Sequence, residues 1–107
     1  MVIGHHDLSS AVVKRAAFSS AAAADIVAAV TGKRIRVTSI VCSNSAAGNI
    51  VFKSGTTDVG TLVAKTADPT IVLPWNPDGW FQTVVSEKFA MTPTGGTATG
   101  FITYIEV

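Results

Sequence analysis

Short apolar, β-branched runs separated by turn residues follow one another from Lys33 to Val107. The predicted strands cover residues 35–42, 50–53, 61–65, 70–73, 80–85, 89–92 and 98–107. Glycine, proline, asparagine and serine lie at the breaks between them. This spacing predicts an all-β chain folded as an antiparallel two-sheet sandwich, jelly-roll-like, with about eight or nine short strands.

The first 32 residues allow two interpretations. Residues 1–10 are predicted to form an N-terminal arm that lies on a neighbour, and residues 11–107 a single β-sandwich domain that begins with a strand over 11–18. Residues 19–32 have the composition of a helix capped by serines and stopped by Gly32. Alternatively, a strand over 26–30 turns at Thr31-Gly32 into the next strand. We favour this hairpin, because the helix would be short and marginal in water.

Two details of the hydrophobic alternation refine the prediction. Ile35 and Val37 share one face of their strand, but Ile40 and Cys42 have the opposite parity. This phase slip predicts a β-bulge near Thr38-Ser39, of the kind that lets one strand serve two sheets. The final strand has apolar residues on both faces, which indicates a central or doubly covered strand.

Composition and charge narrow the range of possible functions and partners. Apolar residues make up 48% of the 107 residues and charged residues 14%, against roughly 25% charged in an average soluble protein. We expect some apolar faces to be buried against copies of the chain or another protein. The net charge of +1 does not indicate nucleic acid as a partner. The N-terminus lacks signal-peptide character and no apolar run approaches the ~20 residues of a membrane span, so no membrane partner is expected.

The residues that carry chemistry are few and scattered. His5 and His6 are the only histidines, and adjacent residues of an extended arm point apart. Cys42 lies in an apolar run, where we expect it to be buried as a small hydrophobe. The carboxylates fall mostly at turns, and none has zinc-like spacing with a histidine or cysteine. We therefore predict no enzyme, no metal site and no cofactor.

One stretch is conspicuous, and it is called the aromatic turn here: residues 74–81, Pro-Trp-Asn-Pro-Asp-Gly-Trp-Phe. The favoured interpretation is that its aromatic side chains close one end of the sandwich while Asn-Pro-Asp-Gly makes the turn. Two alternatives are a stacking platform for a sugar and a set of anchors in a protein interface. The candidate interface residues are His5, His6, Arg34, Arg36, Trp75 and Trp80.

Four stretches of the chain resemble small β-sandwich structural proteins of tailed bacteriophages. They are residues 26–37, residues 51–58, residues 73–81, which contain the aromatic turn, and the closing residues 102–107. The resemblance extends over residues 26–107, and it favours the strand interpretation of residues 26–30.

The resemblance implies a virion protein of the capsid decoration or cement type. Its partner would be the major capsid protein, with a homotrimer the favoured oligomer. Its location would be the capsid exterior, after synthesis in the host cytoplasm. The alternative is a glycan- or receptor-binding module of a phage fibre or tail.

Overall fold

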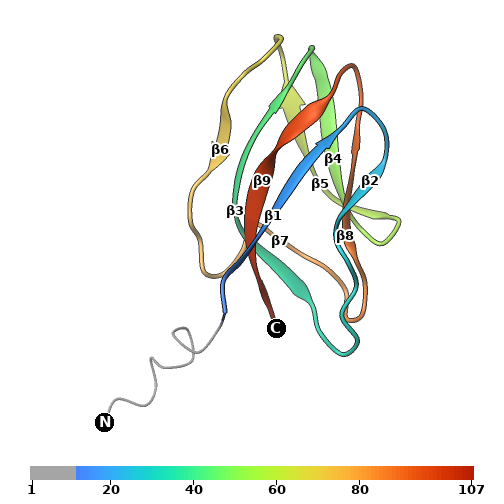
Figure 1. Ribbon diagram of the computed structural model, residues 1–107, viewed down its shortest axis with the longest axis vertical. Helices are drawn as coiled ribbons and strands as arrows, with labels where there is room; N and C mark the ends of the chain where they lie inside the picture. The colour runs from blue at the N-terminus through green and yellow to red at the C-terminus, as the bar shows by residue number, and fades with distance from the viewer. Residues whose placement is uncertain (1–11) are drawn as a thin grey trace.

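The computed structural model describes residues 12–107, which form two antiparallel sheets packed against each other, with no helix (Figure 1). The predicted all-β sandwich is confirmed. Residues 1–11, which include the predicted arm with His5 and His6, lie outside the described part. The nine strands are β1 (Lys14–Ser20), β2 (Ala24–Val27), β3 (Ile35–Asn44), β4 (Gly48–Ser54), β5 (Thr57–Ala64), β6 (Ile71–Leu73), β7 (Phe81–Gln82), β8 (Phe89–Pro93) and β9 (Ala98–Glu106).

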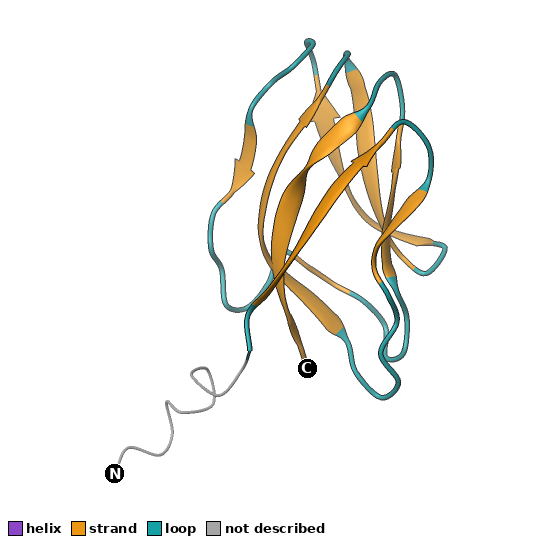
Figure 2. Cartoon of the chain, in the orientation of Figure 1, coloured by secondary structure: helices purple, strands orange, loops and turns teal. Residues whose placement is uncertain are grey.

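The strand order is that of a jelly roll. One sheet, called sheet A here, has the order β1-β9-β3-β6, and β7 also pairs with β3. The other, sheet B, has the order β2-β8-β4-β5. The pairs β1·β9, β2·β8, β3·β6 and β4·β5 are therefore nested, with the outermost pair in sequence joining the two ends of the described chain (Figure 2). Two Greek keys wound in this way are the jelly-roll arrangement.

A cluster of phenylalanines fills the space between the sheets. Phe52, which is fully buried, stacks on Phe89 with ring centroids 5.5 Å apart. The ring centroid of Phe81 lies 5.3 Å from that of Phe52, and the ring of Phe18 packs edge-on against Phe52 with centroids 6.4 Å apart. Because β1 and β7 belong to sheet A and β4 and β8 to sheet B, this cluster joins the two layers.

The predicted bulge in β3 is present at Thr38. Val37 pairs with Tyr104 and Ser39 with Thr103, so Thr38 is the extra residue. Its hydroxyl lies 2.8 Å from that of Thr103. The bulge does not divide β3 between two sheets, because β3 pairs with β9 in sheet A on both sides of it. That part of the prediction was wrong.

The hairpin expected around Thr31-Gly32 is also absent. Residues 24–27 do form a strand rather than a helix, but β2 pairs with β8 in sheet B, whereas β3 lies in sheet A. The segment between them crosses from one sheet to the other, with Gly32 at φ +77°. Neighbouring strong β runs predicted strands correctly, but not which sheet each strand joins.

The last strand and the cysteine follow the prediction. β9 is central, with β1 on one side and β3 on the other. Cys42 is buried, and burial raises the pKa of its thiol to about 11. Residues 12–107 contain no helix with the length and apolar character needed to cross a membrane.

Candidate interaction surface

The aromatic turn is closed by asparagine and glycine. The Asn76 side-chain oxygen accepts a hydrogen bond from the Asp78 amide at 3.0 Å, and the Asn76 carbonyl accepts one from the Gly79 amide at 2.9 Å. Gly79 has φ +84°, a backbone conformation that residues with a Cβ rarely adopt. The predicted Asn-Pro-Asp-Gly turn is therefore present.

The bulge in β3 anchors this turn to sheet A. The Asn76 amide donates to the carbonyl of Thr38, and the Trp80 amide donates to that of Val37, both at 2.8 Å. A further bond within the turn joins the Trp80 indole N–H to the Pro74 carbonyl at 2.7 Å. The turn therefore has a defined position at the β7 side of sheet A.

The two tryptophans do not close the end of the sandwich. Trp75 is 54% exposed and Trp80 is 41% exposed, whereas Phe81 packs into the phenylalanine cluster. Of the three aromatic side chains in the turn, only the phenylalanine acts as the favoured interpretation predicted. Within residues 12–107, the close aromatic pairs are formed by phenylalanines, and neither indole stacks on the other.

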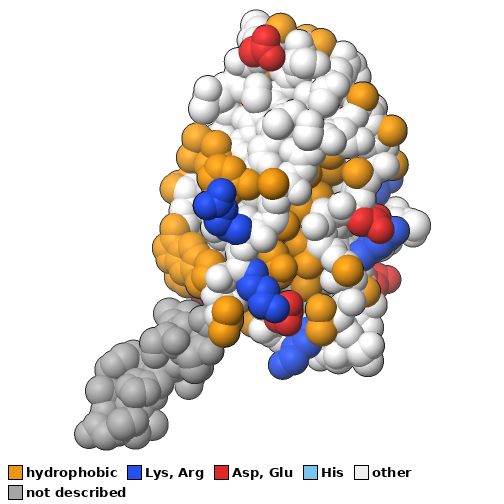
Figure 3. All heavy atoms as spheres, in the orientation of Figure 1, with side chains coloured by type: hydrophobic (Ala, Val, Ile, Leu, Met, Phe, Trp, Pro, Cys, Tyr) orange, Lys and Arg blue, Asp and Glu red, His pale blue; other side chains and the backbone are white. Residues whose placement is uncertain are grey.

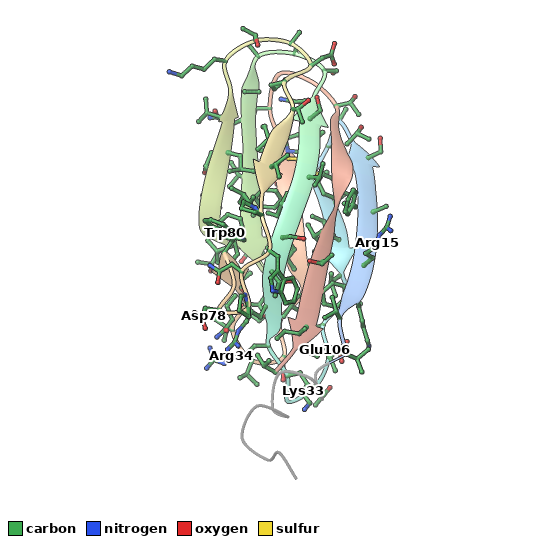
Figure 4. All side chains as sticks on the ribbon, turned by 90° about the vertical axis from the view of Figure 1, so that its left-hand side faces the viewer. Arg15, Lys33, Arg34, Asp78, Trp80 and Glu106 are labelled. Carbon is green, nitrogen blue, oxygen red and sulfur yellow. The ribbon has the colours of Figure 1, made fainter. Side chains whose placement is uncertain are left out.

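Pairing of β7 with β3 brings the arginines to the aromatic turn. Arg34 and Arg36 flank the fully buried Ile35, so both lie on the outer face of sheet A, the face turned away from sheet B. The Arg36 Nε donates to the Gln82 side-chain oxygen at 2.9 Å. Figure 4 shows Arg34, Asp78 and Trp80 on the same side of the molecule. Four of the six candidate interface residues thus lie in one region.

Arg15 and Phe101 form a contact that the sequence-based site did not include. The Arg15 guanidinium lies 4.7 Å from the centroid of the Phe101 ring, a cation–π distance. Alternation along 98–107 places Phe101 opposite in parity to the buried Ile102, which was the available signal. The pairing of β1 with β9, which brings Arg15 to it, joins segments at opposite ends of the chain.

Charged side chains on the side of sheet B form ion pairs. A surface hollow of about 340 Å³ lies against sheet B, and its charged lining residues form the ion pairs Lys88–Asp25 at 2.9 Å and Lys53–Asp58 at 3.3 Å. Residues 12–107 hold no group of three or more histidine, cysteine or acidic side chains that could bind a metal ion. Within this part of the chain, the exposed aromatic and arginine side chains are the prominent surface feature.

Replacing Gly79 with alanine is expected to lower the free energy of unfolding by about 2 kcal/mol. The positive φ strains any residue with a Cβ, and the added Cβ would lie 2.5 Å from the Arg36 Cγ. Gly32→Ala is the matched control, because Gly32 has a similar φ and nothing within 4 Å of the new Cβ. Urea unfolding of both variants measures the difference. Equal losses would show that the contact with Arg36 contributes nothing.

A scan against protein-family models and a search of curated proteins found no match to this chain.

Proposed function

We propose that this chain is a non-enzymatic structural protein of a phage virion, a decoration or cement protein that binds the outer surface of the head. The observation that carries the proposal is the number of large apolar side chains left exposed on a folded sandwich. Those at least one-third exposed are Val12, Val13, Val63, Val72, Trp75, Trp80, Val84, Val85 and Val107. These side chains leave apolar surface available for burial against a partner.

The surface and the fold support the same role. On the face drawn in Figure 3, charged side chains are few and hydrophobic ones reach the surface between them. Many viral capsid and lectin domains have the jelly-roll fold, although a fold alone does not define a function. The resemblance of residues 26–107 to phage structural proteins favours the capsid over other partners.

The proposed partner is the major capsid protein, and the proposed oligomer is a homotrimer on the capsid exterior. A head presents the same surface many times, so an oligomer can engage several capsid subunits at once. Such multivalent attachment gives an avidity well above the affinity of one contact. Modest contacts from each copy would then be enough for stable decoration.

The test is binding of the purified protein to phage heads that lack it. We expect saturable binding and a rise in the temperature at which the heads release their DNA. Heads already saturated with the protein are the control and should bind no more. Absence of saturable binding, or unchanged heat resistance of the decorated heads, would contradict the proposal.

The second candidate is a glycan- or receptor-binding module of a fibre or tail. The exposure of Trp75 and Trp80, beside the polar groups of Asn76 and Asp78, favours it, because exposed indoles stack well on sugar rings. Titration with soluble sugars, followed by tryptophan fluorescence, separates the two candidates. A saturable change that Trp75→Ala abolishes, in a protein that does not bind heads, would favour the glycan module.

A further inference from the structure

Several rows of residues paired across neighbouring strands cross each outer face, and one such row, called a rung here, differs between the two sheets. In sheet A this rung is Ala17, Phe101, Val41 and Val72, taken in order across β1, β9, β3 and β6. In sheet B the corresponding rung is Asp25, Ala90, Lys53 and Asp58, across β2, β8, β4 and β5. An unbroken apolar row therefore crosses sheet A, whereas a charged row crosses sheet B.

The row on sheet A is accessible. Val72 is 52% exposed at one end and Ala17 is exposed at the other, with Phe101 and Val41 half-buried between them. Each of these side chains points away from the core, because its neighbours along the strand, such as Cys42 and Ile102, point inward and are buried. The side chains of this apolar row therefore do not take part in the packing between the two sheets.

The positively charged side chains of the two faces also differ in residue type and in pairing. On the side of sheet B, Lys53 and Lys88 each pair with an aspartate, Asp58 and Asp25. On sheet A, Lys14 pairs with Glu106 at 2.9 Å, whereas Arg15, Arg34 and Arg36 form no ion pair within residues 12–107. Arginine and aromatic residues are enriched in protein interfaces and lysine is depleted.

The arginines lie beyond the apolar row in one direction along the strands, because Arg15 pairs with Thr103 and Arg36 with Ile105, both further along β9 than Phe101. Arg15 is on β1, where its guanidinium covers the Phe101 ring. Arg36 is toward the opposite edge of sheet A, paired with Gln82 of β7, with Arg34 two residues before it. Figure 4 shows Arg15 on one side of the molecule and Arg34 on the other. A partner that covers the apolar row and extends along the strands toward Glu106 would therefore meet positive charge at both edges of sheet A.

We infer that the outer face of sheet A is the docking face of this protein, and that its partner is an acidic protein surface with an apolar centre. Within the proposed function, on which this inference rests, that surface belongs to the capsid. Carboxylates match the unpaired arginines, and an apolar patch matches the row from Ala17 to Val72. Nucleic acid fits less well, because the side chains of the apolar row form neither hydrogen bonds nor ion pairs with phosphates and the chain has a net charge of only +1.

The first experiment compares two charge-neutralising double variants with the same change in net charge. Arg15→Gln/Arg36→Gln should weaken binding to phage heads by about 30-fold, whereas Lys53→Gln/Lys88→Gln should change it less than about twofold. A second pair tests the apolar row with exposed valines on edge strands. Val72→Gln should weaken binding, and Val63→Gln, on β5 of sheet B, should not. Equal effects of the two faces would overturn the inference.

A second experiment does not depend on the phage head. NMR titration of the labelled protein with a synthetic glutamate-rich peptide that contains leucines should shift amides of β1, β3 and β9, and the shifts should disappear in Arg15→Gln/Arg36→Gln. Shifts confined to sheet B, no shifts at all, or equal shifts with a DNA oligonucleotide would overturn the inference. If heads fail to bind but the peptide shifts sheet A, the docking face stands and the proposed function fails.

Arg36 also has a structural contact with Gln82, so folding of each variant is checked by thermal unfolding. Arg15→Lys/Arg36→Lys provides a charge-preserving variant at the same two positions. It should retain most peptide binding, because the positive charge remains. A loss as large as that of the glutamine variant, with normal thermal unfolding, would show that charge is not what the partner recognises.

Discussion

Replacing Phe52 with alanine should lower the free energy of unfolding by about 4 kcal/mol. Phe52 is fully buried and contacts phenylalanines from both layers: Phe18 and Phe81 of sheet A, and Phe89 of its own sheet. Removal of the ring leaves a cavity that neither sheet can close without moving its neighbours. Domains of this size are stable by only about 5–15 kcal/mol, so the variant should be marginally folded at 25 °C.

Urea unfolding followed by circular dichroism measures this loss. Phe101→Ala is the matched control, because Phe101 lies in the central strand β9 but on the outer face, half-buried beneath Arg15. It should lose only about 1 kcal/mol. If both variants lost the same amount, the phenylalanine cluster would not be the centre of the core.

Local alternation predicted those parts of the fold that depend on one strand at a time. The change of parity between Val37 and Ile40 revealed the bulge, because a two-residue period can only be broken by an extra residue. The apolar residues on both faces of the last strand revealed its central place in sheet A. Both features can be recognised from consecutive residues of one strand.

Long-range pairing could not be read in the same way. The run around Val27 was placed beside β3 because it precedes β3 in sequence, yet β2 pairs with β8. The exposure of Trp75 and Trp80 depends on carbonyls of the β3 bulge that hold the aromatic turn in place. The apolar row of sheet A requires the registers of four strands at once, so it has no counterpart in any single segment.

Alkaline pH should destabilise the protein through Cys42. Cys42 is 3% exposed, and burial raises the pKa of its thiol from 9.0 to about 11. Above pH 9 the unfolded chain loses this proton while the folded chain retains it, so the equilibrium shifts toward unfolding. The contribution of the neutral thiol is complete below pH 9 and is lost as the pH rises through 11. The expected loss between pH 9 and pH 11 is about 2 kcal/mol.

Cys42→Ala separates this effect from the other groups that titrate in the same range. Lys14, for example, has its pKa raised by a hydrogen bond to Glu106, and the stability from that pair is also lost at high pH. The alanine variant still loses the stability that Lys14 contributes, but it has no thiol to titrate. The free energy of unfolding of both proteins is measured by urea unfolding from pH 8 to pH 11, and the change with pH in the difference between them is due to Cys42. Parallel pH dependences would contradict a buried neutral thiol. A difference that widens with pH shows that β3 excludes water from its inner face, as the packing of sheet A on sheet B requires.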